Sequence, residues 1–439
     1  MKRILIALAV LLSVQVADAQ VKAIDSAKKA VEAAEEAAQN PKKNTKVATW
    51  LKVATSYMAA YEAPAGNALL NTPRMQLQMM MAGEKPVSVE EAIVDGATYR
   101  KEVYTNKNLY FDPMDILRIV EVTQPVYADP LAKALEAYTK AYEVDASKSK
   151  EKDIKAGIQT IAEKYFIDGM NQYSLNNYTK SAELLVKAAA ASETAPNSVV
   201  DTTSLYNAGY IFWATKDYDS AKKYFERCLA ENYYYENGEV FAKLGEVYFN
   251  LGNNAKGVEI LETGFVKFPH SQSILIGLIN YYLNSGENAD RLFELIAEAK
   301  KNEPNNVSLY YVEGNIYKQL GQNEKAIEAY KACATVDPNY DFGYHGQGVL
   351  YYDMAVKLSE KAAEELDDAK YAAMVKEYEQ YLINAIEPFE KAFEVTANPD
   401  VKMNCAEYLK NIYYRFSSVE DKYMQGYTKY NEYVKANAQ

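Results

Sequence analysis

The feature that most constrains this chain is an internal repeat. Blocks of about 34 residues, several of which end in proline, recur from about residue 202 to residue 340. A single block of this kind cannot bury its apolar face alone and does so only by stacking on its neighbours. The sequence therefore predicts a stack of short helical units in place of one globular core.

The clearest block runs from Val307 to Tyr340. Its signature residues fall on a first helix, a turn and a second helix, and they are Gly314, Tyr317, Gly321, Ala326, Tyr330, Cys333 and Pro338. The equivalent residues of the preceding well-matched block are Gly245, Tyr248, Gly257, Leu261, Gly264 and Pro269. Small residues are needed where paired helices approach most closely, and bulky ones fill the space between neighbouring blocks.

This pattern resembles the tetratricopeptide repeat. The resemblance implies an all-α fold, a right-handed α-superhelix of helix hairpins. The expected organisation is a signal peptide (1–19), an N-terminal helix (20–44), a first repeat (45–146) interrupted by an α/β insert (about 64–128), a repeat array (147–340), a repeat with an elongated helical arm (341–399) and a C-terminal capping helix pair (400–439).

The insert differs in composition from the repeats around it. We expect Arg74–Met81 to be helical. The run Met79-Met80-Met81 is expected to fill gaps in a core, with an adaptable contact surface as the alternative, and Ser88 and Glu91 are expected to form a helix capping box. A hairpin and a further strand are predicted over Tyr99–Tyr104, Leu109–Phe111 and Ile116–Val126. The insert should therefore be a small β-containing subdomain.

The N-terminus has the layout of a cleavable signal. A basic Met1-Lys2-Arg3 precedes the apolar run Ile4–Val16, and Ala17-Asp18-Ala19 supplies small residues at the cleavage position. A membrane anchor would need about 17–25 apolar residues. We expect an exported protein, periplasmic or secreted, and the combination is similar to exported tetratricopeptide proteins of the Bacteroidales type.

The amino-acid composition argues against most kinds of catalytic and metal-binding site. The chain holds 39 Tyr but only 2 His and 3 Cys, and its net charge is −12. Catalysis or metal binding through several His is therefore excluded, and the acidic balance disfavours nucleic acid as a partner. We expect a protein that is not an enzyme and uses no cofactor and no metal. The odd number of cysteines also makes a disulfide framework improbable.

In tetratricopeptide arrays the first helix of each repeat lines a concave groove. The positions that the resemblance assigns to the groove are rich in Tyr and Asn, side chains suited to binding a peptide or protein segment. These candidate partner-binding residues are Tyr206, Asn207, Tyr210, Trp213, Lys243, Glu246, Asn280, Asn284, Tyr311, Asn315, His345 and Tyr352. Mutation of the four tyrosines among them is predicted to affect binding more than folding.

The sequence thus predicts an exported scaffold that mediates protein–protein interaction in the bacterial envelope. One alternative is an accessory glycan-binding protein that uses exposed aromatic residues, with Tyr233 and Tyr235 as candidates. Another is that the groove residues are ordinary solvent-exposed side chains. A third places an enzyme site in the insert, although no motif there supports it.

Overall fold

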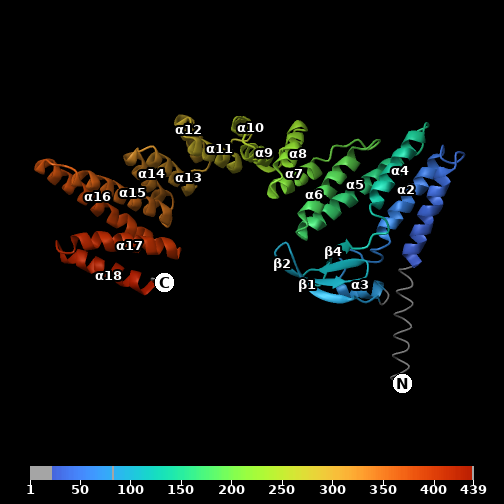
Figure 1. The fold of residues 1–439 in the computed structure, drawn as a ribbon, viewed down its shortest axis with the longest axis horizontal. Helices are drawn as coiled ribbons and strands as arrows, with labels where there is room; N and C mark the ends of the chain where they lie inside the picture. Colours follow the sequence, from blue (N-terminus) through green and yellow to red (C-terminus); the bar gives the residue numbers. More distant parts are fainter. Residues whose placement is uncertain (1–21, 82–83, 438–439) are drawn as a thin grey trace, which may run out of the picture. The chain divides into compact units, whose positions relative to one another are not determined.

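The computed structural model describes residues 22–81 and 84–437, most of them α-helical (Figure 1). The predicted signal peptide, residues 1–19, lies outside the described residues. The chain divides into two compact units between Ile260 and Leu261. In each unit, helices that follow one another pack as hairpins, and a small sheet is inserted near the N-terminus. The expected all-α architecture of helix hairpins with a β-containing insert is confirmed.

The first unit begins with a helix over residues 22–39. The elements that follow are α2 (Val47–Glu62), α3 (Arg74–Met80), α4 (Pro130–Val144), α5 (Glu151–Ser174), α6 (Tyr178–Glu193), α7 (Thr202–Ala214), α8 (Tyr218–Ala230), the 3-10 helix η1 (Glu236–Gly238) and α9 (Glu239–Asn250). The helix α10 (Asn254–Lys267) contains the division between the units. Although the insert separates α2 from α4, these two helices pack against each other as a hairpin.

Local sequence fixes where several of these helices begin. Asp129 accepts a hydrogen bond of 3.0 Å from the backbone N–H of Ala132, and Pro130 occupies the first turn of α4. Asp201 and Asp217 cap α7 and α8 in the same way. Because each cap satisfies a backbone N–H that would otherwise lack a partner, these helices begin at defined residues.

The insert is a four-stranded antiparallel sheet in the order β1-β2-β3-β4. Its strands are β1 (Ser88–Val94), β2 (Ala97–Val103), β3 (Lys107–Phe111) and β4 (Leu117–Val122). The predicted hairpin and third strand are present, but the predicted capping box is wrong. Ser88 begins the edge strand β1 and does not cap a helix. Val89 and Ile93 pair with β2, and this strand pairing outweighs the local helix-capping pattern.

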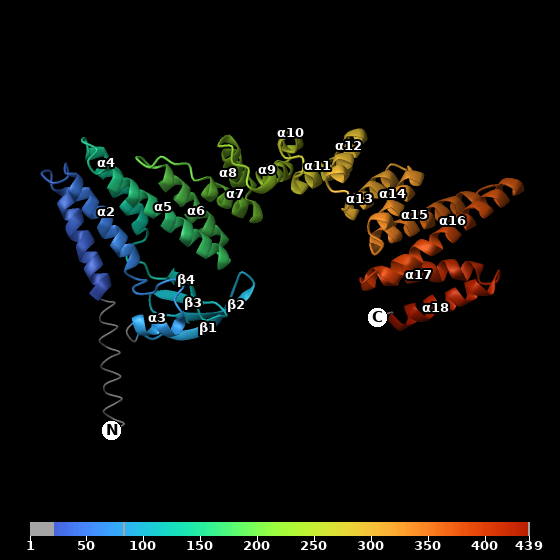
Figure 2. The same ribbon diagram turned by 180° about the vertical axis from the view of Figure 1, so that it is seen from behind.

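Both faces of the sheet are covered in part. On one face, Leu77 of α3 packs with Leu109, Phe111 and Leu117. On the other, Tyr110 and Ile119 pack with Leu175, which follows α5. Ser174 donates a hydrogen bond of 2.9 Å to Asp95 at the same junction. The sheet is therefore fixed against the C-terminal end of α5, as both views of the ribbon show (Figure 2).

The core of the insert also holds charged side chains. The Lys107 and Glu102 side chains are each only 1% exposed. The Lys107 ammonium contacts Glu84 at 3.1 Å, and Glu102 accepts hydrogen bonds from Arg100 and Tyr104 at 3.0 and 2.9 Å. Burial lowers the pKa of Lys107, and the neighbouring Glu84 carboxylate counteracts part of this decrease. All these groups are paired, so the arrangement ties the strands together and presents no free nucleophile.

The second unit continues the succession of hairpins. Its helices are α11 (Gln272–Ser285), α12 (Ala289–Asn302), α13 (Val307–Gln319), α14 (Asn323–Val336), α15 (Asp341–Ala363), α16 (Asp368–Val395), α17 (Pro399–Phe416) and α18 (Asp421–Asn437). The long pair α15 and α16 corresponds to the predicted arm, and Pro388 lies inside α16 without interrupting it.

The signature small residues of this unit mark close helix approach. A Cβ atom on Gly314 would lie 2.6 Å from the Tyr330 ring, and one on Gly348 would lie 2.7 Å from the Phe389 ring. Only glycine fits these positions without displacing a ring. The three cysteines of the chain are likewise fully buried and unpaired, so they act as small packing residues.

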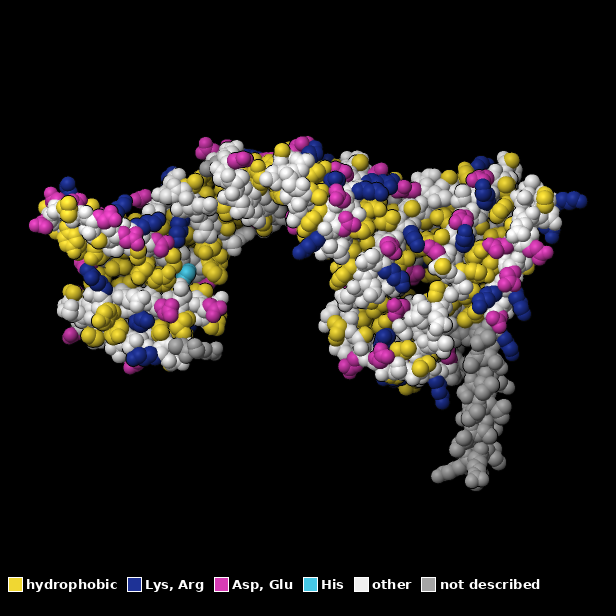
Figure 3. Space-filling view, viewed as in Figure 1, with side chains coloured by type: hydrophobic (Ala, Val, Ile, Leu, Met, Phe, Trp, Pro, Cys, Tyr) yellow, Lys and Arg dark blue, Asp and Glu magenta, His cyan; other side chains and the backbone are white. Residues whose placement is uncertain are grey.

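The surface mixes both signs of charge. On the face shown in Figure 3, Lys and Arg lie among Asp and Glu in each unit, and hydrophobic side chains line the seams between neighbouring helices. Within the described residues, no helix combines the length and the apolar composition needed to cross a membrane.

Candidate partner-binding surface

Three predicted groove residues form a row of rings along α7. The centroids of the Tyr206 and Tyr210 rings are 6.4 Å apart, and those of Tyr210 and Trp213 are 5.4 Å apart. The spacing of three or four residues places all three side chains on one face of the helix. The Lys243 ammonium of α9 extends the row, because it lies 3.5 Å from the centroid of the Trp213 ring.

The turn before α9 adds a fourth ring. Tyr235 stacks on Tyr206 with a centroid distance of 4.0 Å and an interplanar angle of 20°. Its φ is +47°, and Gly238 in the same turn has a φ of +86°. A positive φ is unfavourable for a residue with a Cβ, so stacking on Tyr206 helps to hold this turn. We name Tyr206, Tyr210, Trp213, Tyr235 and Lys243 the α7–α9 aromatic surface.

The members of this surface are not equally open. Tyr206 is only 6% exposed, so the expectation that its side chain lies free in a groove is corrected: Tyr235 covers it and Phe225 packs beside it. Tyr210 and Trp213 are half-buried, with part of each ring accessible, and Tyr235 is 39% exposed. Tyr206 is therefore the packed base of the surface, and its neighbours form the accessible part.

Polar groups flank the rings. Lys243 is held by Glu239 at 3.5 Å, and Glu246 is exposed one turn further along α9. Asn207 donates a hydrogen bond of 2.9 Å to the Thr203 carbonyl of its own helix. The surface thus combines apolar ring area with one cation and nearby carboxylates.

The predicted groove residues of the second unit are arranged differently. Asn280 and Asn284 are exposed on α11. Tyr311 lies within a cluster of rings, 5.8 Å from Tyr330 and from Phe342 and 6.0 Å from Tyr340. Asn315 accepts a hydrogen bond of 2.8 Å from the Tyr330 hydroxyl. Tyr311 and Asn315 therefore take part in packing between α13 and α14.

His345 and Tyr352 on α15 contact the next hairpin, and both side chains are half-buried. The Nε2 atom of His345 lies 2.7 Å from the amide oxygen of Asn404, and the Tyr352 ring lies 4.7 Å from the Tyr408 ring. Both partners belong to α17. Each of these two side chains is thus engaged by α17 and keeps an accessible part, and Tyr352 also lines a pocket of about 270 Å³ between α15, α16 and α17.

Two accessible features were not predicted from the sequence. One lies on the insert, where Met75, Met79, Val87 and Ile93 are exposed. Of the run Met79-Met80-Met81, Met81 is buried as expected of a core residue, whereas Met79 is exposed, as in the alternative of a contact surface. The sequence of β1 also suits the start of a helix, so the exposure of its side chains on an edge strand cannot be deduced from the sequence.

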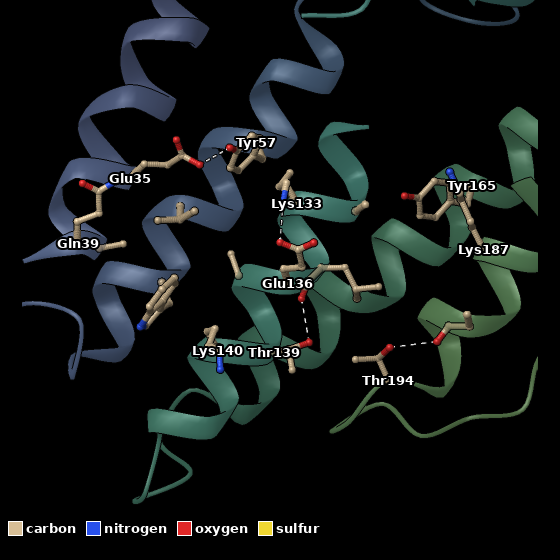
Figure 4. A pocket seen from close by; sticks show the side chains of 17 residues that line it. Glu35, Gln39, Tyr57, Lys133, Glu136, Thr139, Lys140, Tyr165, Lys187 and Thr194 are labelled. Carbon is tan, nitrogen blue, oxygen red and sulfur yellow. Dashed lines mark hydrogen bonds and ion pairs between the residues drawn. The ribbon is translucent and has the colours of Figure 1, made fainter. Parts of the chain in front are cut away.

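The other feature is a pocket of about 790 Å³ in the first unit. Figure 4 shows that its lining comes from the helix over residues 22–39, from α2 and α4, and from α5 and α6. The apolar side chains of the lining include Ala38, Trp50, Val53, Leu135, Ala137 and Ala190. The remaining lining residues are Glu35, Gln39, Tyr57, Ala132, Lys133, Glu136, Thr139, Lys140, Tyr165, Lys187 and Thr194.

Hydrogen bonds hold the polar edge of this pocket in place. Tyr57 donates to Glu35, and burial together with this hydrogen bond raises the pKa of Tyr57. Asp129 accepts from Tyr165 at 2.7 Å and from Lys187 at 2.8 Å. Burial alone would raise the pKa of Asp129. The hydrogen bonds from Lys187 and Tyr165 outweigh burial and lower this pKa, so Asp129 stays ionised beside Lys187. No sequence repeat predicts the pocket, because five helices contribute to it.

The structure is an array of helix hairpins with an accessible α7–α9 aromatic surface. Neither this surface nor the pocket described above contains a catalytic arrangement of side chains. The family model for the tetratricopeptide repeat matches residues 169–342 of the chain. A TPR repeat-containing protein of Methanocaldococcus jannaschii is 27% identical over 246 residues, which are 52% of this chain and 42% of that relative. The match thus spans less than half of the relative's own length.

Two solved structures are similar to part of the chain. One is YrrB, described as a TPR protein with an unusual peptide-binding site; it is 21% identical, has a TM-score of 0.33, and the match covers 48% of this chain and 98% of YrrB. The other is MamA, at 21% identity and a TM-score of 0.32, with 45% of this chain and 96% of MamA covered.

Proposed function

We propose that this protein is a scaffold that binds a segment of a partner protein on the α7–α9 aromatic surface. The observation that carries the proposal is the continuous row from Tyr235 through Tyr206, Tyr210 and Trp213 to the Lys243 ammonium. Tetratricopeptide arrays are protein-binding scaffolds, and this is the row of predicted groove residues whose accessible rings lie together.

Physical chemistry favours a protein segment as the ligand. Tyr and Trp supply rigid apolar area at a low cost in side-chain entropy, and they are enriched at binding hot spots. The stacked Tyr235 and the packed Tyr206 hold the accessible Tyr210 and Trp213 in place, which reduces the ordering cost on binding. Lys243 and Glu246 can pair with charges that flank an apolar anchor.

The glycan-binding alternative has less support. It relies on Tyr233 and Tyr235, but Tyr233 is half-buried and Tyr235 has one ring face against Tyr206. Retardation on a polysaccharide affinity gel that disappears in Tyr235→Ala would favour this alternative.

The proposal is tested by photo-crosslinking in the source cells. The photoreactive p-benzoyl-phenylalanine replaces Tyr210 or Glu246 in separate variants, and Glu231, exposed at the end of α8, serves as the matched control position. We expect mass spectrometry to identify the same partner from positions 210 and 246 and not from 231. Adducts that are equally frequent at all three positions, or none at all, would refute the surface.

The proposal also includes export to the bacterial envelope, supported by the basic, apolar and small-residue segments of residues 1–19. We expect the mature protein to begin at Gln20 and to fractionate with periplasmic or secreted proteins. Mass spectrometry of the native N-terminus checks this independently of binding. A mature chain that retains residues 1–19 in the cytoplasm would contradict export.

A further inference from the structure

The two edges of the insert sheet differ in what covers them. The strand order places β1 at one edge and β4 at the other. The β4 edge is closed at its start, because the Leu117 carbonyl accepts a hydrogen bond of 2.8 Å from the Asn71 N–H, and the Leu117 N–H donates one of 3.0 Å to the Thr72 carbonyl. Among the described residues no strand pairs with the outer side of β1, which forms the margin of the sheet in both ribbon views (Figure 1 and Figure 2).

The turn between β1 and β2 fixes which backbone groups of β1 point outward. Asp95 and Gly96 have φ values of +48° and +80°, and two positive φ values define a two-residue type I′ turn. In such a turn the Ala97 N–H bonds to the Val94 carbonyl, so Val94 and Ala97 are a hydrogen-bonded pair. Hydrogen-bonded and non-hydrogen-bonded pairs then alternate along the two strands.

Val89, Glu91 and Ile93 fall at the non-hydrogen-bonded positions of this alternation. Each of them therefore directs a backbone N–H and a C=O away from β2, toward the open side of the sheet. The Val103 carbonyl agrees with this alternation, because it faces β1 and accepts a hydrogen bond of 2.7 Å from the Val87 N–H. A row of unpaired donors and acceptors of this kind is a template for pairing with another chain.

The side chains of the same three residues lie on one face of the sheet, because successive side chains of a strand alternate. Val89 and Ile93 are exposed, and so is Glu91 between them. Arg100 lies directly across from Glu91 on β2, but its guanidinium binds Glu102 at 3.0 Å. Glu91 forms no ion pair with any described residue. The edge therefore offers an apolar, an acidic and an apolar side chain in a row.

We propose that the β1 edge binds an extended segment of a partner protein that carries a basic residue between two apolar ones and adds to the sheet as a further strand. The apolar side chains of the segment lie beside Val89 and Ile93, and its Lys or Arg lies beside Glu91. In this mode of recognition main-chain hydrogen bonds supply affinity, and alternate side chains supply specificity. Opposite charges directly across neighbouring strands stabilise the pairing.

A second copy of this chain fits the edge less well. If two β1 strands pair antiparallel with all three outward residues matched, Glu91 lies opposite Glu91 of the other copy. A shift by two residues in one direction places Glu90 opposite Glu90, and a shift in the other direction leaves Val89 unmatched. Like charges directly opposite each other destabilise a strand pair. The glutamates of β1 thus disfavour self-association and favour a basic partner.

A short peptide tests the proposal on the unmodified full chain. The probe is the fluorescently labelled peptide Thr-Val-Thr-Lys-Thr-Val-Thr, whose Lys lies opposite Glu91 in the antiparallel register, and its binding is measured by fluorescence anisotropy. The matched peptide with Glu in place of Lys should bind roughly fivefold more weakly. Methylation of the backbone nitrogen of the Lys, which points toward β1, should weaken binding on the order of tenfold. Methylation of the next Thr nitrogen, which points away, should leave it within about twofold.

Variants of β1 test the same register from the protein side. Glu91→Pro removes one outward N–H and no bond to β2, a change that edge strands tolerate, and should weaken the Lys peptide on the order of tenfold. Glu91→Thr keeps the N–H and removes the charge, so the Lys and Glu peptides should bind it within about twofold of each other. Glu231→Thr, at an exposed position outside the insert, is the matched control and should keep the preference for Lys.

Four results overturn the proposal. They are a lack of saturable binding of the Lys peptide, equal binding of the Lys and Glu peptides, equal weakening by methylation at the two nitrogens, and a dimer in sedimentation that Glu91→Pro dissociates. The methylated peptides are measured on the unmodified chain, so the outcome does not depend on the folding of a variant. The α7–α9 aromatic surface shares no residue with the insert. Cross-linking at position 210 should therefore be unaffected by Glu91→Pro, which separates this test from that of the scaffold function.

Discussion

The α7–α9 aromatic surface and the face of α15 occupy equivalent places in their repeats, yet they differ in what covers them. On α7 the rings of Tyr210 and Trp213 keep an accessible part. On α15 the side chains of His345 and Tyr352 are engaged by Asn404 and Tyr408 of α17. Position within a repeat therefore sets the direction of a side chain, and the next hairpin decides whether that side chain already has a partner within the chain.

The difference has a local cause in the first unit. The turn between α8 and α9 places Tyr235 against Tyr206 through a positive φ, so the added ring extends the surface. The α17 residues instead pair with the side chains of α15. Three substitutions and one thiol-labelling experiment test how closely the side chains of the two units are packed.

The largest effect is expected for Tyr206→Ala. This ring is buried between Tyr235 and Phe225, so its removal leaves a cavity and should lower the free energy of unfolding by about 3 kcal/mol. Urea unfolding followed by circular dichroism measures the loss. Tyr210→Ala, on the same face but half-buried, is the control and should cost about 1 kcal/mol. Equal losses would show that Tyr206 is no more packed than Tyr210.

An effect of about 1–3 kcal/mol is expected for Ala326→Leu in the second unit. Ala326 is fully buried in a cluster with Tyr330 and Leu350, and a longer side chain must displace them. Ala373→Leu, at an exposed position of α16, is the matched control. If both variants melt at the temperature of the unmodified protein, the repeat register is wrong at α14.

A smaller effect is expected at the contact between α15 and α17. His345→Ala removes the hydrogen bond to Asn404, and a double-mutant cycle with Asn404→Ala should give a coupling energy of about 1 kcal/mol. Hydrogen exchange in α17 should rise in both single variants. A coupling energy of zero would mean that His345 faces open solvent.

The smallest effect concerns the buried thiols of both units. Burial raises the pKa of Cys333 to about 11 and the pKa values of Cys228 and Cys405 to about 12. Unfolded thiols ionise near pH 8.5, so the unfolded state loses protons first. Stability therefore changes little at pH 8 and falls as the pH rises from about 8.5 through the raised pKa values of the folded state. In native protein at pH 8, reaction with Ellman's reagent should require unfolding at all three sites. Immediate labelling of one thiol would contradict its packing.

Much of the fold was predictable because repeat packing leaves a local signature. Gly314 and Ala326 must be small wherever two helices meet closely, and that requirement is visible in one block of sequence. The strand β1 was missed because Ser88 and Glu91 also suit a helix start, and only pairing with β2 separates the two.

The candidate site was predictable only in part. The register placed Tyr206, Tyr210 and Trp213 on one helix face, and this is where the structure has them. Their exposure depends on residues distant in sequence, as with Tyr235 over Tyr206. The pocket around Trp50 is formed by residues from five helices, so no local sequence pattern predicts it.

The central claim is that the rings of Tyr210 and Trp213 on α7 bind a partner, whereas His345 and Tyr352 of α15, which contact α17, do not. The most direct measurement is the affinity of the cross-linked partner segment for Tyr210→Ala and Tyr352→Ala, two identical truncations at equivalent faces. We predict that Tyr210→Ala weakens binding on the order of tenfold and that Tyr352→Ala leaves it within about twofold. Unchanged binding in Tyr210→Ala with a tenfold loss in Tyr352→Ala would contradict the account.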